Sequence, residues 1–217
     1  FTGDDDQAIM GFQGADVRRF LTATKEKEVL SKSYRLPQEP WFEAQRIVSR
    51  IRGRAPKEWS AKDEAGSVQH HQSLWDLPLE SGEWCIMART NHIANGYADM
   101  LRKEGWVYSR YGHPSIPPKT YQAILDWERF CKEGKIDVNA LRNIYTFMSV
   151  GKGFKRGYSA RSKMMMALDP ETEVTIEDAQ NALGMLVDDT MRWHQALDKV
   201  DVESQNYILN ALKRGDN

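Results

Sequence analysis

Hydrophobic positions repeat with two different periods along the chain, and the change falls near Gly112. Residues 84–88 form a continuous apolar run, which is typical of a strand buried on both faces of a parallel sheet. Residues 93–101 then have helical spacing that ends at Gly105, and residues 106–108 are again strand-like. A strand, a helix and a second strand in this order predict a parallel crossover, so we expect the middle of the chain to be α/β.

Beyond this point the helical period continues, which predicts a mostly helical unit from about residue 113 onward. Thr175 and Asp178 have the spacing of a capping box, so a helix is expected to start there and to continue to residue 187. The other expected helices are residues 119–131, 137–148, 191–197 and 201–212. The side chains expected in the core of this unit include Trp127, Trp193 and the methionines of residues 164–166.

The first third of the chain predicts shorter elements. Asp16 is suited to cap a short helix, and residues 41–51 have helical spacing. Residues 53–66 are polar, basic and irregular. The segments expected to be strands, or the end of one, are residues 1–2, 29–30 and 68–75.

Charged residues make up 28% of the chain, but the net charge is only −1. Nothing global therefore draws the protein to nucleic acid, and such a contact would need a local basic patch. The two cysteines are too few for a disulfide framework and fit a reducing cytoplasm. No apolar run approaches the roughly 18–20 residues that span a membrane, and no signal peptide is recognisable. The missing initial methionine and the abrupt ends favour an internal piece of a longer protein.

Residues 3–7 are the first candidate for chemistry. Gly3 and three consecutive aspartates form a loop directly after the expected strand end, and Gln7 lies just beyond its tip. Ligands bind at the carboxyl ends of strands in an open α/β sheet. An amide such as that of Gln7 can donate to a phosphate oxygen and accept a hydrogen bond from water at once. An acidic surface loop is the alternative for the aspartates alone.

The segment from Gly3 to Ile9, followed by Gly11-Phe12 and Gly14-Ala15, resembles the GDDDQ-(S/A)-IY-x-(F/W)-R-GA motif of UvrD/Rep-type superfamily 1 DNA helicases. The resemblance implies that Gln7 senses the γ-phosphate of ATP and its attacking water. It also implies that Met10, Phe12 and Gln13 face single-stranded DNA.

Two of these DNA-facing positions depart from the family pattern. Met10 replaces a tyrosine, and Gln13 replaces an arginine or lysine. Phe12 keeps an aromatic face for base stacking. We therefore expect weaker stacking at Met10 and a weaker phosphate contact at Gln13, which carries no charge.

Ser33-Tyr34-Arg35 is the second candidate, although by itself such a segment is more often an exposed Tyr-Arg pair before a helix. It resembles the (N/S)-Y-R segment that opens the second RecA-like core of the same helicases. The resemblance implies that Tyr34 stacks on adenine and that Arg35 is an arginine finger. A guanidinium suits this role because it is always charged and its planar fork matches phosphoryl oxygens. Leu36-Pro37 replaces the Ser-Thr that often follows in the family.

Two further segments could contact DNA. Arg89 and Asn91 lie where a predicted strand meets a helix N-terminus, as in the R-x-N of the family, which implies a contact with the DNA backbone. An ordinary helix cap with a solvated arginine is the alternative. Residues 151–163 combine basic, glycine and aromatic positions. These suit a duplex-contacting loop, although a solvated loop within the helical unit is the favoured interpretation.

The resemblance implies an α/β fold, namely a partial RecA-like P-loop NTPase core with a mostly helical inserted subdomain. Residues 1–27 would end the first core, residues 28–112 would begin the second, and residues 113–217 would form the insertion. The implied activity is ATP-dependent DNA helicase or translocase action, with 3′ to 5′ movement on single-stranded DNA and at single-strand/duplex junctions. Repair or replication proteins are possible partners, and the compartment would be the cytoplasm of a bacterial or phage-infected cell.

The sequence contains no G-x-x-x-x-G-K-(S/T) P-loop and no DExx strand before Gly3. We therefore expect most ligands of ATP and Mg²⁺ to lie outside these residues, so that this chain alone does not hydrolyse ATP. Two alternatives stay open: the helicase part of a recombination helicase–nuclease, and a non-catalytic DNA-binding or scaffold module of the same fold.

Overall fold

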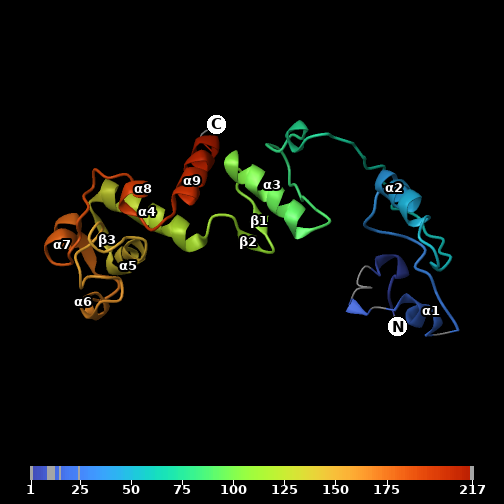
Figure 1. Ribbon diagram of the computed structural model, residues 1–217, viewed down its shortest axis with the longest axis horizontal. Coiled ribbons are helices and arrows are strands. Elements are labelled where there is room, and N and C mark those ends of the chain that lie inside the picture. Colours follow the sequence, from blue (N-terminus) through green and yellow to red (C-terminus); the bar gives the residue numbers. More distant parts are fainter. Residues whose placement is uncertain (1, 9–12, 15, 24, 216–217) are drawn as a thin grey trace. The chain divides into compact units, whose positions relative to one another are not determined.

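A computed structural model describes residues 2–8, 13–14, 16–23 and 25–215 (Figure 1). The chain divides into two compact units, an N-terminal unit of Phe1–Trp84 and a C-terminal unit of Cys85–Asn217. The predicted boundaries at residues 27/28 and 112/113 stay predictions. In the part of the chain that the structure describes, no helix is long and apolar enough to cross a membrane.

The N-terminal unit consists of short helices joined by long irregular segments. Its elements are the 3₁₀ helix η1 (Asp5–Gln7), α1 (Val17–Thr22), α2 (Gln38–Val48) and the 3₁₀ helix η3 (Leu74–Asp76). The carboxylate of Asp16 accepts a hydrogen bond from the backbone amide of Arg18, which confirms its predicted capping role. The helix predicted from residue 41 is confirmed as α2, although it ends at Val48 instead of residue 51.

The irregular residues 60–65 lie alongside residues 31–39. The backbone amides of Ser33 and Gln38 donate to the carbonyls of Ser60 and Glu64 at 2.8 and 2.9 Å. Among the described residues of the N-terminal unit, one parallel bridge joins Lys32 to Ser60. The strand predicted over residues 29–30 is therefore wrong, because those residues form no strand and the bridge is formed by a single residue further along. Residues 68–75 and Thr2 likewise form no strand, while Phe1 lies outside the described residues.

The first part of the C-terminal unit contains α3 (Asn91–Lys103) and the two-residue strands β1 (Ser109–Arg110) and β2 (His113–Pro114), which pair antiparallel. Gly105 ends α3 as predicted. Its φ is +74°, and a Cβ there would lie 2.5 Å from the backbone of Asn210 in α9 (Val202–Gly215). The helix stop is therefore also a point of close packing.

The predicted parallel crossover is not formed by the described residues of this chain. Residues 84–88 and 106–108 have no strand structure, and the exposed fractions of Trp84, Ile86 and Met87 are 47%, 40% and 87%. An apolar run becomes a buried strand only when other strands pair with both of its edges, and none of those described does so here. The strand prediction was therefore wrong for this structure, and a RecA-like core stays a prediction.

The remainder of the C-terminal unit is mostly helical, as predicted. Its elements up to α9 are α4 (Pro118–Glu133), β3 (Lys135–Asp137), α5 (Val138–Thr146), α6 (Lys163–Ala167), β4 (Glu173–Thr175), α7 (Ile176–Asn181) and α8 (Trp193–Ala196). Strands β3 and β4 pair antiparallel. Thr175 and Asp178 form the predicted capping box. The helix that they begin ends at Asn181 instead of residue 187.

A hydrocarbon core fills this unit. Trp127 and Trp193 are buried with exposed fractions of 1% and 5%, which confirms their predicted positions. Met165 is also buried, but Met164 and Met166 are 50% and 60% exposed, so their predicted burial is wrong. Consecutive residues of a helix point in directions about 100° apart, so the short helix α6 turns only one of the three methionines inward.

Candidate functional site

The acidic motif folds into a tight turn at the start of η1. Asp4 caps this 3₁₀ helix, and its carboxylate accepts hydrogen bonds from the backbone amide of Asp6 at 3.1 Å and from the side-chain amide of Gln7 at 2.9 Å. Aspartate favours such local turns because its short side chain reaches the backbone two residues on. Gly3 packs against the ring of Phe20 in α1, since a Cβ there would lie 2.7 Å from that ring.

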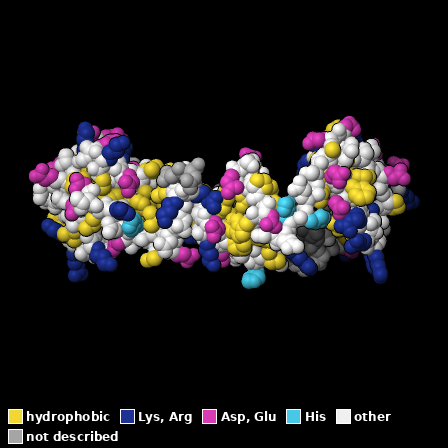
Figure 2. All heavy atoms as spheres, turned by 90° about the horizontal axis from the view of Figure 1, so that it is seen from above, with side chains coloured by type: hydrophobic (Ala, Val, Ile, Leu, Met, Phe, Trp, Pro, Cys, Tyr) yellow, Lys and Arg dark blue, Asp and Glu magenta, His cyan; other side chains and the backbone are white. Residues whose placement is uncertain are grey.

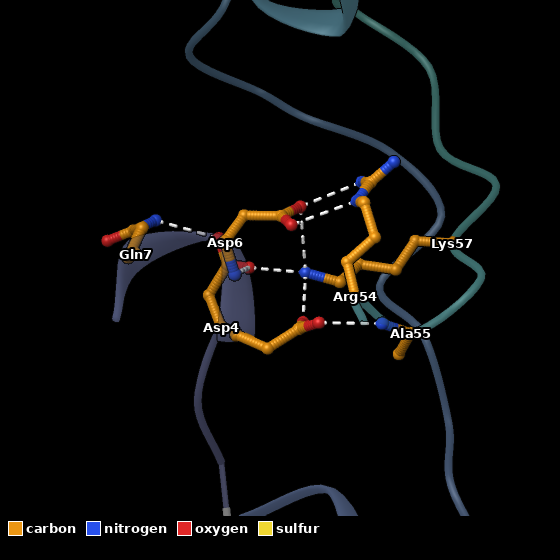
Figure 3. A network of polar contacts seen from close by, with 7 residues as sticks. Asp4, Asp6, Gln7, Arg54, Ala55 and Lys57 are labelled. Carbon is orange, nitrogen blue, oxygen red and sulfur yellow. Dashed lines mark hydrogen bonds and ion pairs between the residues drawn. The ribbon is translucent and has the colours of Figure 1, made fainter. Parts of the chain in front are cut away.

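Two cations from a distant part of the sequence hold this turn (Figure 3). Arg54 makes a bidentate pair with Asp6, with Nε–Oδ1 and Nη2–Oδ2 distances of 2.9 and 2.7 Å. The ammonium of Lys57 contacts the carboxylates of Asp4, Asp5 and Asp6, at 3.0 Å for Asp6. Its three N–H donors can serve three acceptors at once.

The backbone completes the contact between these two segments. The amide of Ala55 donates to Asp5 Oδ2 at 2.7 Å. The side chain of Asp5 is only 2% exposed, and that of Lys57 is 15% exposed. We call Asp4, Asp5, Asp6, Arg54, Ala55 and Lys57 the acidic clamp. Its contacts join two segments whose paired residues are 48 to 53 positions apart in the sequence.

The clamp changes the ionisation of its members. Burial of Asp5 alone would raise its pKa, but hydrogen bonds from Lys57 and the Ala55 amide outweigh burial and lower it. The hydrogen bond from Arg54 lowers the pKa of Asp6, against a smaller effect of burial. Burial of Lys57 would lower its pKa, but the three aspartates raise it well above its usual value. All three groups are therefore held in their charged forms.

Three carboxylates this close also resemble a metal site, since ligand oxygens of Asp4, Asp5 and Asp6 lie within 4.8 Å of one another. The ammonium of Lys57 contacts all three, and Arg54 pairs with Asp6. The protein's own cations therefore already balance most of the acidic charge. Nothing in this arrangement requires Mg²⁺, and the expected Mg²⁺ with its ATP stays a prediction.

Gln7 lies at the exposed end of the turn. Its amide nitrogen donates to Asp4, while its amide oxygen points away from the acidic side chains (Figure 3). This oxygen has no hydrogen bond to a residue that the structure describes. One N–H and the carbonyl oxygen thus stay available, which is the donor and acceptor pair that a phosphate and a water would need.

The second predicted motif presents its side chains to solvent. Ser33 Oγ accepts from the backbone amides of Arg35 and Leu36 at 3.4 and 3.0 Å, which forms a local turn. Tyr34 is 86% exposed, and the side chain of Arg35 is exposed too. Neither side chain has a hydrogen bond or ion pair with any residue described by the structure. Both groups are therefore free to meet a ligand.

The residues predicted to contact DNA are only partly described. Met10 and Phe12 lie outside the described residues, and Gln13 is exposed. In the C-terminal unit, Arg89 is exposed and Thr90 caps α3, so the predicted helix start is confirmed. The amide oxygen of Asn91 accepts a hydrogen bond from the Tyr111 hydroxyl at 2.8 Å, which leaves its amide N–H groups available.

The basic loop of residues 151–163 has a mixed outcome. Its lysines and arginines are exposed: Lys152, Lys155, Arg156, Arg161 and Lys163. Phe154 is 2% exposed and stacks on Tyr145 with a ring-centroid distance of 5.2 Å, so it belongs to the core and is unavailable for base stacking. On the face shown in Figure 2, basic and acidic side chains are interspersed.

The structure thus places two residues that sequence reasoning missed, Arg54 and Lys57, against the aspartates that precede Gln7. Both lie in the stretch that the pattern marked only as polar, basic and irregular. The available signal was electrostatic: three adjacent aspartates need cations, and residues 50–57 contain four basic side chains and no acidic one. Comparison of the sequence with protein-family models and with curated proteins finds no match, so a function has to be inferred from motifs and geometry.

Proposed function

We propose that this chain is part of an ATP-dependent DNA helicase or translocase of the UvrD/Rep type. The observation that carries the proposal is the exposed amide of Gln7 at the end of an ordered Gly-Asp-Asp-Asp turn. The turn has the residue order of the GDDDQ motif, and its geometry leaves a hydrogen-bond donor and acceptor free at the position where that motif senses nucleotide.

In this function, Gln7 orients the attacking water and contacts the γ-phosphate of ATP. Arg35 stabilises the charge that develops on the transferred phosphoryl group, and Tyr34 stacks on adenine. Both side chains are exposed and free of competing contacts among the described residues, as ligand-binding groups must be. The P-loop and the magnesium-binding carboxylate would come from other parts of a longer polypeptide, because the sequence contains neither.

Met10, Phe12 and Gln13 contact single-stranded DNA, and Arg89 and Asn91 contact its backbone. A loop that carries both Gln7 and these residues couples nucleotide state to the hold on DNA. Alternation between high and low affinity for DNA then moves the protein 3′ to 5′ along one strand and into single-strand/duplex junctions.

The proposal is tested in the full-length polypeptide that contains this chain, by measuring DNA-stimulated ATP hydrolysis. Arg35→Ala should lower kcat by about 10³-fold or more, which is the usual contribution of an arginine finger. Gln7→Ala should also lower kcat. Arg50→Ala is the matched control, since Arg50 is another exposed arginine of the N-terminal unit, and it should keep wild-type activity. Unchanged hydrolysis in both Arg35→Ala and Gln7→Ala would refute the proposal.

DNA binding gives a separate test. Phe12→Ala should weaken single-stranded DNA binding at fixed salt by about 1–3 kcal/mol, the range for loss of one base-stacking contact. Fluorescence anisotropy of a labelled oligonucleotide measures the change. Unaltered affinity would contradict the DNA-facing role of this loop without touching the nucleotide role of Gln7.

A further inference from the structure

The irregular residues 54–65 contact both predicted nucleotide motifs of the N-terminal unit. At one end, Arg54 and Lys57 hold the aspartates of the GDDDQ turn. At the other end, Ser60 and Glu64 accept backbone hydrogen bonds from Ser33 and Gln38, on either side of Tyr34 and Arg35. Residues 54–65 form no helix or strand, so no repeating hydrogen bonds hold their backbone in place. The contacts with the two motifs therefore fix the position of this segment.

A continuous chain of contacts leads from Lys57 to Gln7. The ammonium of Lys57 binds the Asp4 carboxylate, and the same carboxylate accepts the Gln7 amide N–H at 2.9 Å (Figure 3). Asp4 also accepts from the backbone amide of Asp6 at 3.1 Å, so its two oxygens fix both the turn and the side chain of Gln7. Which way the Gln7 amide faces therefore depends on where Asp4 is held.

We propose that Lys57 is a positioning residue for Gln7 and acts through the carboxylate of Asp4. This inference rests on the proposed nucleotide-sensing role of Gln7. With its N–H bound to Asp4, the amide keeps its oxygen directed outward, where it can accept a hydrogen bond from the attacking water. Arg54 holds the neighbouring Asp6 by a bidentate pair, so Asp6, which also contacts the ammonium, depends on Lys57 less than Asp4 does.

Removal of the ammonium leaves three adjacent carboxylates with only Arg54 to balance them. The carboxylates of Asp4 and Asp5 then repel each other, and the Gln7 amide loses its fixed acceptor. A misplacement of about 1 Å in a group that orients a reactant can cost about 10²-fold in rate. The effect should fall mainly on kcat, because Lys57 contacts neither Tyr34 nor Arg35 and acts on Gln7, which orients the attacking water.

The test is a double-mutant cycle in the full-length polypeptide, with DNA-stimulated ATP hydrolysis as the measurement. Lys57→Met keeps the length of the side chain without its charge, and it should lower kcat by about 10- to 100-fold with KM for ATP unchanged within about twofold. In the Gln7→Ala background, Lys57→Met should have no further effect on kcat, because both changes remove the same function. Lys57→Arg keeps the cation and should restore most of the activity.

Lys62→Met is the matched control. Lys62 lies on the same segment and pairs with Glu64, but it has no contact with the acidic clamp, so its variant should have wild-type kcat. Equal losses of kcat from Lys57→Met in the wild-type and Gln7→Ala backgrounds would overturn the positioning role while the proposed function stands. No loss of activity in Gln7→Ala would instead refute the nucleotide-sensing role of Gln7 and with it this inference, and no loss in Arg35→Ala as well would refute the proposed function.

Two further measurements cover the remaining outcomes. Asp4→Asn removes the charge that joins Lys57 to Gln7 at a partly exposed side chain, so it should reproduce the kcat loss if Lys57→Met fails to fold. Hydrogen exchange tests the geometry without nucleotide. The backbone amides of Gln7 and Ala8, which bond to Asp4 and Asp5, should exchange faster in Lys57→Met than in Lys62→Met. Equal exchange in the two variants would overturn the inference.

Discussion

The two units of this protein are stabilised in opposite ways. In the N-terminal unit, Asp5 and Ala61 are the buried residues among those described, and the ion pairs of the acidic clamp join segments about fifty positions apart. In the C-terminal unit, a continuous hydrocarbon core joins α4, α5, α7 and α8, with Trp127, Phe130 and Leu141 at most 1% exposed. One unit is therefore held mainly by charge and the other mainly by apolar burial.

The hydrocarbon core therefore lies in the C-terminal unit, whereas the candidate chemistry of Gln7 lies in the N-terminal unit. Apolar burial is nondirectional and scales with area, so it makes a robust core but leaves no reactive group exposed. An ionic network fixes particular atoms, and in the N-terminal unit it fixes the turn that presents Gln7. We expect the two units to respond differently to core truncation, backbone strain, loss of a cation and acid.

The largest expected effect is truncation of the hydrocarbon core. Trp127→Ala should destabilise the C-terminal unit by about 3–5 kcal/mol, because the indole is buried and its N–H donates to the Met191 carbonyl. Urea denaturation followed by hydrogen-exchange mass spectrometry measures it. Trp75→Ala, at a 43% exposed tryptophan, is the control and should cost less than about 1 kcal/mol. Similar losses in the two variants would contradict the contrast between the units.

The second-largest loss of stability should come from backbone strain after a glycine is replaced by alanine. Two glycines with similar φ values provide a matched pair. Gly105 and Gly53 have φ of +74° and +79°, so alanine at either position costs about 1–2 kcal/mol for the left-handed conformation. Only Gly105 is also packed, 2.5 Å from the Asn210 backbone at its ideal Cβ, whereas no atom lies within 4 Å at Gly53. Gly105→Ala should therefore be clearly the more destabilising in urea denaturation. Equal effects would show that α9 can shift freely.

Loss of the clamp's central cation should have a smaller effect that is confined to the N-terminal unit. Lys57→Ala leaves Asp5 buried without its main partner, which should cost about 2 kcal/mol, below the range for a fully buried pair. Hydrogen exchange of residues 31–65 should accelerate, while that of residues 120–200 stays unchanged. Acceleration in both regions would mean that the units do not unfold separately.

Acid should produce the smallest of these effects on the same network. The pKa values of Asp5 and Asp6 are lowered, so the clamp's contribution is fully present above about pH 3.9 and is lost as pH falls through the lowered values. The raised pKa of Lys57 has the opposite sign, so its contribution is complete below about pH 10.4 and is lost only above that. The loss in acid should be less than for Lys57→Ala, because Arg54 and Lys57 can still donate to neutral carboxyls.

Residue-resolved NMR spectra recorded from pH 6 down to pH 2 measure this effect. The amide resonances of Asp5, Asp6 and Ala55 should shift together as the clamp is lost, before the core resonances of Leu141 and Ile144 change. Simultaneous loss of all these resonances would contradict the electrostatic basis of the N-terminal unit.

Prediction from sequence succeeded where a local signal was sufficient. The caps at Asp16 and Thr175 and the helix stop at Gly105 were correct, because each depends on a few neighbouring residues. The burial of Trp127 and Trp193 followed from helical period. Strands failed, since the apolar run of residues 84–88 needs partner strands that its own pattern does not specify.

The features of the candidate site also divide into local ones, which the sequence predicts, and long-range ones, which it does not. The amino-acid sequence by itself determined the order of the acidic turn and the position of Gln7 after it, because turn chemistry is a local property. The exposure of Tyr34 and Arg35 depends on what the fold packs against them, so the structure decided it. Only the tertiary structure decided that Arg54 and Lys57 neutralise the aspartates and that Asp4 orients the Gln7 amide. Ion pairs carry no periodicity along a sequence, and only the folded backbone brings charges about fifty positions apart within a few ångströms.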